Sequence, residues 1–329
     1  MMQPQLLAAA EISKATSMDL SKCVACGHIG AEPFLKAPDR FHARPKIYSL
    51  VQCPQCSLVW LEDPPPLEDM GEHYGPDYDA LIAESGETSP EHWHPRRDML
   101  LQQKQGGALL DLGCSSGAFL SLIKGPKWQL YGIEISEDSA TRARSRTGAE
   151  VFVGDVLAAS FPDGEFDAVS CFHVFEHMYM PQAVLGRVWR WLKPGGVFVA
   201  EMPNIHCQEA RFFQSYWYPL ELPRHLYHFS PAAFRALAAN FGFEEVRLTT
   251  MRARFVDYHL RYLGDTFWRS LGRPRRPMMQ DRPGLAWRMV RKMLRLGVYP
   301  ALSWITSSRG DASMMQVVLR KPEAGCSAQ

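Results

Sequence analysis

The stretch that decides the fold is ALLDLGCSSGAFL, residues 108–120. It starts as an apolar run typical of a buried strand, breaks at a turn of small residues and continues as a helix. Asp111 stands at the end of the strand, and Gly113 and Gly117 bracket the turn. Glycine permits the sharp turn, and the first N–H groups of the helix point back at whatever occupies it. In an open α/β sheet this place is the ligand-binding crevice at the carboxyl ends of the strands.

Strand-like and helix-like runs alternate from this stretch onward. The alternation predicts an α/β fold with a doubly wound, mainly parallel sheet of seven strands. The predicted strands cover residues 108–112, 130–134, 150–153, 166–172, 197–201, 244–250 and 315–320. The predicted helices cover residues 118–124, 137–147, 181–192 and 231–241, and a short helix at 96–105 is expected after a loop at 83–95.

Two C-x2-C pairs precede this region: Cys23 with Cys26, and Cys53 with Cys56. Each pair offers two thiolates from one tight turn, and two such turns complete a tetrahedron around Zn²⁺. Because all four ligand positions are filled, we expect a structural zinc ribbon rather than a catalytic metal. The alternatives are four reduced cysteines at coincidental spacing, or a redox-active pair.

These patterns divide the chain into seven expected parts. They are a flexible tail (1–18), the zinc ribbon (19–60), a proline-rich linker with N-terminal helices (61–105), the core (106–250), a basic helical insertion (251–309), the last core strand (310–322) and a second tail (323–329).

The charge of the chain is unevenly distributed. The net charge is only +1, which gives the whole chain no footprint for nucleic acid. Residues 250–309 contain 13 Lys or Arg and 3 Asp or Glu, a local charge of +10, so the rest carries +1 − 10 = −9. Basic and apolar residues interleave here, as in WRMVRKMLR at 287–295. The segment is interpreted as a solvated basic lid, a membrane-surface segment or a subunit contact.

No targeting or spanning segment is evident. The first 17 residues lack a basic region followed by an apolar core, and no apolar run is long enough to span a bilayer. We therefore expect a cytoplasmic protein that contacts the inner membrane surface peripherally through residues 251–309.

Three acidic residues stand at the ends of the first three predicted strands: Asp111, Glu134 and Asp155. A dinucleotide site needs a third glycine in the turn. The acid before the first glycine suits a positively charged ligand better than a pyrophosphate. Acids without a basic partner suit a positively charged ligand instead, namely a sulfonium amino acid joined to adenosine. Glu134 is placed to accept the ribose hydroxyls, and Asp155 to reach the adenine amino group.

Residues 109–204 resemble a class I S-adenosylmethionine-dependent methyltransferase. The matching blocks are LDLG (110–113), GIE (132–134), GD (154–155), FDAV (166–169), EH (176–177), LKPGGV (192–197) and MPN (202–204). The resemblance implies S-adenosylmethionine as cofactor. It places Asp111, Gly113 and Gly117 around the methionine part, Glu134 on the ribose, Asp155 and Val156 at the adenine, and Phe172 nearby. Ser115 stands where the family usually has glycine.

The order of the parts narrows the expected acceptor. A four-cysteine ribbon, a proline linker, Tyr74 with Tyr78 and then this core resemble bacterial methyltransferases of sugar and polysaccharide modification. We therefore expect methylation of a small molecule, a sugar or glycan precursor linked to a nucleotide or lipid. The alternatives are an RNA or protein methyltransferase that uses the ribbon for recognition, and a non-catalytic scaffold that binds the cofactor.

Methyl transfer to a hydroxyl or an enolisable carbon needs a base, and histidine is the usual one. His225, His177 and His228 are the candidates, because His177 follows the fourth core strand and the other two precede a helix on the ligand side. His173, Glu176 and His177 also have the spacing of a divalent metal site. Some quinone methyltransferases that resemble this block use such an ion, but His173 stands where they have an acid.

Overall fold

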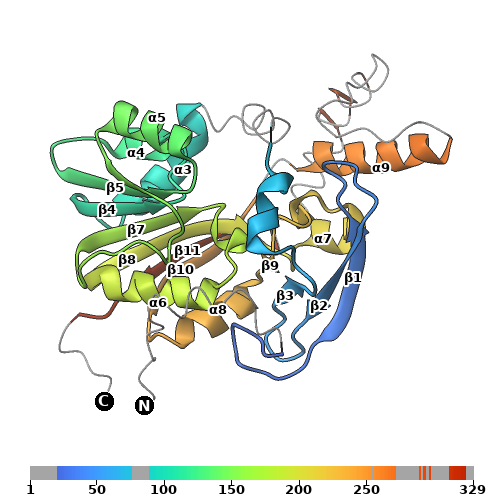
Figure 1. The fold of residues 1–329 in the computed structure, drawn as a ribbon, viewed down its shortest axis with the longest axis horizontal. Coiled ribbons are helices and arrows are strands. Elements are labelled where there is room, and N and C mark those ends of the chain that lie inside the picture. The colour runs from blue at the N-terminus through green and yellow to red at the C-terminus, as the bar shows by residue number, and fades with distance from the viewer. Residues whose placement is uncertain are drawn as a thin grey trace.

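The computed structural model describes residues 21–75, 89–252, 255–271, 289, 292–293, 296–297 and 311–323 (Figure 1). The predicted first tail, Tyr78, most of the second tail and much of the predicted insertion lie outside these residues.

A large sheet forms the body of the protein, with the strand order β10-β11-β8-β7-β4-β5-β6. Only β11 runs antiparallel to its neighbours, so the predicted seven-stranded, mainly parallel sheet is confirmed. The strands are β4 (Gly107–Leu112), β5 (Trp128–Glu134), β6 (Glu150–Val153), β7 (Phe166–Phe172), β8 (Leu192–Pro203), β10 (Glu244–Met251) and β11 (Met314–Arg320).

Helices cover both faces of this sheet. Helices α3 (Pro90–Leu101), α4 (Ala118–Ile123) and α5 (Glu137–Thr147) lie on one side, and α6 (Pro181–Trp191) and α8 (Pro231–Ala239) on the other (Figure 1). The side chains of Ser136 and Ser230 accept hydrogen bonds at the starts of α5 and α8, as N-caps do.

Two local predictions are wrong. Helix α3 begins at Pro90 and ends at Leu101, so residues 90–95 are helical rather than part of a loop. Proline is tolerated in the first helical turn, which explains why Pro90 starts a helix instead of excluding one. The strand predicted at 197–201 is also too short, because β8 begins at Leu192, directly after α6.

The cysteine region forms a second, smaller antiparallel sheet of four strands, ordered β1-β2-β3-β9. Its strands are β1 (Glu32–Pro38), β2 (Ile47–Gln52), β3 (Val59–Leu61) and β9 (Tyr227–His228). Strand β9 comes from the part of the chain predicted as core. The predicted domain limits stay predictions. The small sheet, however, contains strands from both sides of the ribbon limit predicted after residue 60.

Beyond β8 the chain forms α7 (Gln208–Phe213), two 3-10 turns, η3 (Gln214–Tyr216) and η4 (Tyr218–Leu220), and, before the last strand, α9 (Val256–Ser270). On α9, Tyr262 is buried against Phe41 and Tyr218. Among the described residues, no helix combines the length and apolarity needed to cross a membrane.

Candidate functional site

The turn after β4 has the shape that the sequence predicts. Gly113 and Gly117 have φ of +69° and +74°, in the left-handed region. A Cβ on Gly113 would lie 2.4 Å from Cγ2 of Val174, so space as well as conformation requires glycine there. Ser115 adopts φ +48°, and its N–H donates to Oε2 of Glu134 at 2.8 Å. The turn and the carboxyl end of β5 are thus tied together.

The predicted cofactor carboxylates lie at the carboxyl ends of β4, β5 and just after β6. Asp111 is buried and accepts a 2.6 Å hydrogen bond from the Ser170 hydroxyl. Burial raises the pKa of Asp111 to about 7, although the Ser170 bond opposes that rise. Glu134 accepts from two backbone N–H groups, those of Ser115 and Ser136. Asp155 is exposed and accepts from the N–H of Leu157 at 2.7 Å.

The two predicted apolar contacts with the cofactor are both buried. Val156 follows Asp155, and Phe172 ends β7. The Phe172 ring packs edge-to-face on Phe119 of α4 at 4.8 Å and on Trp93 of α3 at 6.2 Å. Helix α3 therefore covers the side of the crevice where β4 and β7 end.

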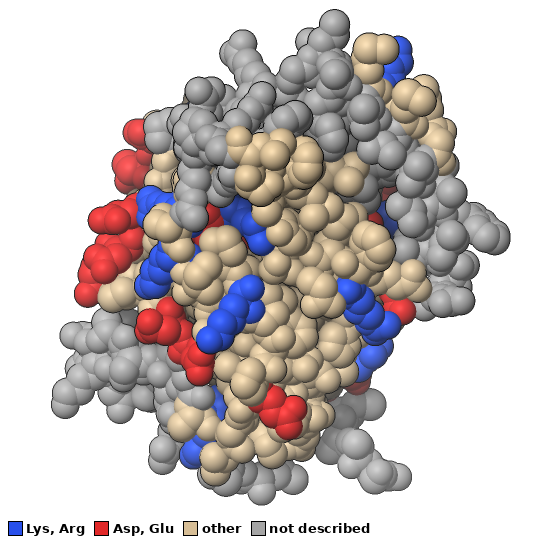
Figure 2. All heavy atoms as spheres, turned by 90° about the vertical axis from the view of Figure 1, so that its right-hand side faces the viewer, with Lys and Arg blue, Asp and Glu red and all other residues tan. Residues whose placement is uncertain are grey.

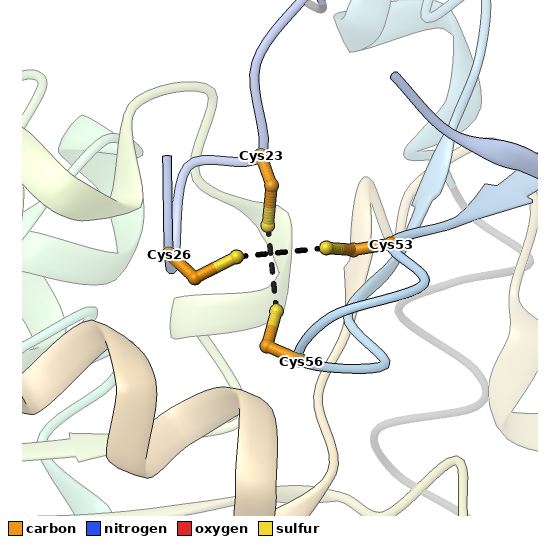
Figure 3. A group of neighbouring side chains, drawn as sticks. All are labelled: Cys23, Cys26, Cys53 and Cys56. Atoms are coloured by element: carbon orange, nitrogen blue, oxygen red, sulfur yellow. Dashed lines mark hydrogen bonds between the residues drawn. The ribbon is translucent and has the colours of Figure 1, made fainter. Parts of the chain in front are cut away.

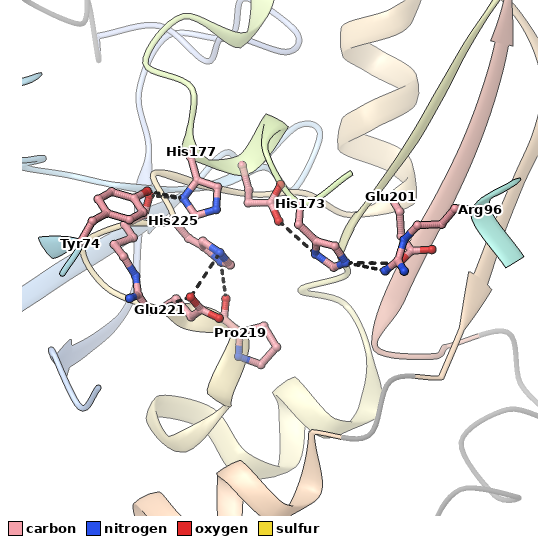
Figure 4. A network of polar contacts seen from close by, with 10 residues as sticks. Tyr74, Arg96, His173, His177, Glu201, Pro219, Glu221 and His225 are labelled. Atoms are coloured by element: carbon pink, nitrogen blue, oxygen red, sulfur yellow. Dashed lines mark hydrogen bonds and ion pairs between the residues drawn. The ribbon is translucent and has the colours of Figure 1, made fainter. Parts of the chain in front are cut away.

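Arg96 also lies at this end of the sheet, and no pattern in the sequence indicated this. It comes from α3, is buried, pairs with Glu201 of β8, and its guanidinium lies 2.9 Å from Nε2 of His173 (Figure 4). His173 directly follows β7 with φ +57°. Burial lowers the pKa of His173, but the neighbouring carboxylates of Glu176 and Glu201 outweigh burial and raise the pKa to about 9.

His177 and His225, both predicted bases, lie next to each other. His177 ends η2 (Phe175–His177), and its ring centre is 4.5 Å from that of His225. Nδ1 of His177 lies 3.0 Å from the Tyr74 hydroxyl and 3.0 Å from the carbonyl of Arg224. Nδ1 of His225 lies 2.8 Å from the carbonyl of Pro219. Figure 4 shows the two rings between Tyr74 and His173.

Both rings are neutral at pH 7. Burial lowers the pKa of His177 to about 4 and that of His225 to about 3, and the neighbouring ring contributes for His177. A carbonyl only accepts hydrogen bonds, so Nδ1 of His225 carries the proton in the bond to Pro219. Nε2 of His225 then carries no proton and has a free lone pair. This nitrogen lies 3.8 Å from Oε2 of Glu221.

His228, the third predicted base, sits deeper. It lies in β9 opposite Val59 of β3, its ring centre is 6.1 Å from that of His225, and it is 2 % exposed. Burial lowers its pKa to about 3. Neither ring nitrogen has a hydrogen-bond partner, and both carboxylate oxygens of buried Glu176 also have none.

The residues that could hold a divalent ion differ from those suggested by spacing. Ligand atoms of Glu176, His177 and His225 lie within 4.8 Å of one another. His173 is not in this group, because its Nε2 turns toward Arg96 and Glu201. The i, i+3, i+4 spacing therefore does not bring its three members into one metal site.

The four cysteines of the small sheet converge (Figure 3). Cys23 and Cys56 have sulfurs 3.5 Å apart, and so do Cys26 and Cys53. A tetrahedral Zn²⁺ with four thiolates needs sulfurs about 3.8 Å apart. All four are free thiols on two tight turns, and three are buried. This donor set fits a structural Zn²⁺.

Comparisons with known proteins agree with the geometry. A family of methyltransferase domains matches residues 87–248. The ubiquinone biosynthesis O-methyltransferase of Thiobacillus denitrificans is 30 % identical over 159 residues, which cover 44 % of this chain and 68 % of that protein. The 24-methylenesterol C-methyltransferase 2 of Oryza sativa subsp. japonica is 36 % identical over 109 residues, 31 % of this chain and 30 % of its own length. This chain thus spans less than a third of that relative.

A solved structure confirms the fold. The SAM-dependent methyltransferase of Archaeoglobus fulgidus superposes with a TM-score of 0.50 at 19 % identity, over 74 % of this chain and 100 % of that one. The sheet order, the glycine turn with its acidic neighbours and the matching relatives lead to one conclusion: the chain belongs to the class I S-adenosylmethionine-dependent methyltransferases.

Proposed function

We propose that this protein transfers a methyl group to a small polar acceptor bound beside His177 and His225. One observation carries the proposal: buried His225 and half-buried His177, both neutral, face each other at the carboxyl end of the sheet with ring centres 4.5 Å apart. Taking a polar ring out of water costs free energy unless its nitrogens form hydrogen bonds. Here the carbonyl of Arg224 holds Nδ1 of His177, and the carbonyl of Pro219 holds Nδ1 of His225, so that both rings are oriented as bases must be.

S-adenosylmethionine supplies an electrophilic methyl group on a sulfonium. On this chain, Glu134 would accept the ribose hydroxyls, Asp155 and Val156 would hold the adenine, and Phe172 would cover it. Asp111, Gly113 and Gly117 would surround the methionine part. Arg96, with His173 beside it, is suited to its carboxylate, the one anionic group that the three acids cannot bind.

The histidines would take the proton that the acceptor must lose. The acceptor O–H or C–H bond would break and its proton would pass to Nε2 of His225 or His177. The freed electron pair would bond to the methyl carbon as that carbon leaves the cofactor's sulfur, which would keep the electron pair of the S–C bond. Tyr74 and the Arg224 carbonyl orient His177, and Pro219 orients His225. His228 lies behind His225 and is assigned to positioning it.

The acceptor is proposed to be a sugar or glycan precursor. The unpartnered carboxylate oxygens of Glu176 and the hydroxyl of Tyr74 support this, because buried groups of this kind pair well with several hydroxyls. A quinol or sterol is the second candidate, favoured by the names of the relatives. Pairing of β3 with β9 makes the ribbon part of the acceptor side, which argues against a detached module for RNA or protein.

Two experiments test the proposal. The purified protein is incubated with methyl-labelled S-adenosylmethionine and a panel of nucleotide-linked sugars, lipid-linked sugars and quinols, and label transfer is measured. We expect transfer to one sugar class, while transfer to quinols alone would replace the proposed acceptor. Calorimetry measures cofactor binding, and an absence of binding heat would rule out the enzyme. Metal analysis is expected to give one Zn²⁺ per chain.

A further inference from the structure

Helix α9 carries an exposed apolar stripe beside its buried face. The buried face holds His259 and Tyr262. Beside it, Leu263 and Phe267 are 38 % and 60 % exposed, and Leu271, just after the helix, is 63 % exposed. These three residues are spaced by four and form one stripe. A surface helix normally turns polar residues outward, so this stripe indicates a missing apolar neighbour.

A further apolar side chain is exposed on α7. Phe212 is 79 % exposed, and its neighbour Phe213 packs on the ring of His259 at 4.4 Å. We call Phe212, Leu263, Phe267 and Leu271 the α9 surface. Helix α9 projects from the right-hand side of the molecule in Figure 1, and Figure 2 views that side, where much of the described surface carries no charge.

A second exposed apolar stripe follows in the sequence. Met289, Met293 and Leu296 are 61 %, 74 % and 75 % exposed, and their spacing of four and three places them on one helical face. The N–H of Gly297 donates to the carbonyl of Met293 at 3.0 Å, as in a helical turn. Lys292 is exposed within this turn.

The charge around these stripes is strongly positive. Residues 250–309 carry 13 Lys or Arg against 3 Asp or Glu, while the remainder has a net charge of −9. The charge is therefore unevenly distributed along the chain. An anionic surface would attract this segment and repel the rest of the chain.

We propose that the α9 surface docks on an anionic phospholipid bilayer. The exposed Phe and Leu side chains of this surface enter the boundary between headgroups and acyl chains, and the net positive charge of residues 250–309 attracts anionic headgroups. A nucleic acid offers no apolar medium for Phe267 and Leu271. A second copy of the chain carries the same local charge of +10 and repels it.

Docking here would place the acceptor site close to the membrane. Tyr262, on the inner side of α9, packs against Tyr218. The next residue, Pro219, gives its carbonyl to Nδ1 of His225. The α9 surface is thus two packed side chains away from the proposed base, a position suited to an acceptor held on a lipid carrier. The docking proposal does not depend on which acceptor is methylated.

Vesicle flotation tests the proposal with the full chain and no substrate. Vesicles contain phosphatidylcholine alone or with about one third phosphatidylglycerol. We expect binding only to the anionic vesicles, weakened at least tenfold when salt rises from 0.05 M to 0.5 M, since salt screens the charges. Phe267→Ser with Leu271→Ser is expected to reduce binding at least tenfold, and Phe212→Ser on α7 also to reduce it. Ile135→Ser, an equally exposed residue after β5, should leave vesicle binding unchanged.

Three results would overturn the proposal. They are equal binding to neutral and anionic vesicles, no binding to either, and unchanged binding after both sets of serine substitutions. Light scattering adds a fourth: a stable dimer that Phe267→Ser dissolves would mean that a second copy covers this surface. Circular dichroism shows whether each variant is folded, and Phe212→Ser tests the surface independently of α9.

Discussion

The cofactor half and the acceptor half of this protein are built in different ways. In the cofactor half, Glu134 and Asp155 are partly or fully exposed, and backbone N–H groups a few residues away hold Asp155 and one oxygen of Glu134. In the acceptor half, His225 is buried and His177 is half-buried, and their partners come from remote segments such as Tyr74. The first half is a local motif, whereas the second exists only when the whole chain has folded.

This difference separates binding from turnover. Substitutions in the cofactor half should change affinity for S-adenosylmethionine, because we propose that its carboxylates contact the cofactor directly. Substitutions in the acceptor half should change the rate of methyl transfer and leave that affinity alone. Five changes test this division, from the largest expected effect to the smallest.

His225→Asn removes Nε2 but keeps an N–H that can donate to the Pro219 carbonyl in place of Nδ1–H. We expect kcat to fall by about 10²–10⁴, the usual contribution of a general base. The affinity for S-adenosylmethionine, measured by calorimetry, should stay within about threefold. His177→Asn tests the second ring, and His28→Asn in the ribbon is the control. Full turnover in both site variants would refute the assignment of the base.

Cys53→Ser tests whether the ribbon belongs to the acceptor half. Loss of a metal bound at 1,000 times its Kd lowers the free energy of unfolding by about 4 kcal/mol, or Tm by about 10 °C. Because β3 pairs with β9, turnover should fall along with Zn²⁺ content while cofactor affinity persists. Gln55→Ala, exposed in the same turn, is the control. A variant that keeps full metal occupancy would exclude the zinc ribbon.

Glu134→Ala acts on the cofactor half alone. Loss of two charge-assisted hydrogen bonds to a ribose should weaken S-adenosylmethionine binding about 100-fold. Calorimetry measures the change, and kcat at saturating cofactor should stay within a few-fold of the native value. Glu137→Ala, three residues on and paired with Arg144 at the surface, serves as the control. If kcat fell as far as affinity, the two halves would not be separable.

Gly113→Ala probes the place where the halves touch. An added Cβ at Gly113 meets Val174, whereas at Gly148, with a similar φ of +73°, nothing lies within 4 Å. Gly148→Ala should cost about 1 kcal/mol for the left-handed conformation alone. Gly113→Ala should cost about 2 kcal/mol more, because Val174 must move. Urea denaturation measures both, and equal costs would mean that Val174 yields freely.

His173 gives the smallest effect. Its pKa is raised in the folded state to about 9 from an ordinary value near 6.5, by Glu176 and Glu201 against the opposing effect of burial. The stability that its charge contributes is fully present below pH 6.5 and is lost as pH rises through 9. The stability difference between native protein and His173→Gln should therefore shrink over this range. A difference that grows with pH would mean that His173 is neutral.

The sequence predicts the cofactor half well and the acceptor half only in outline. The bounds of α5, β6 and β7 match the predicted ranges, since apolar periodicity and caps are local signals. The acids at the ends of β4 and β5 follow from the same pattern. The three histidines are also found, but not their arrangement.

Long-range pairing explains what was missed. Arg96 joins His173 and Glu201 across three elements, and no spacing in the sequence indicates that contact. The pairing of β9 with the ribbon sheet is also a long-range contact. In addition, β9 has only two residues, which are too few to show the alternation typical of a strand. Helix α3 was misplaced because its prolines resemble a loop.

The pairing of β3 with β9 also sets an order of assembly. During synthesis the cysteine turns and β3 leave the ribosome long before residues 227–228 exist, so β3 keeps an open edge while most of the core is made. An unpaired edge strand is prone to stray pairing. A metal bound early would fix this edge as a template, and β9 would complete the acceptor side last. Swapping the ribbon for that of another protein would therefore require transplanting its distant partner strand as well.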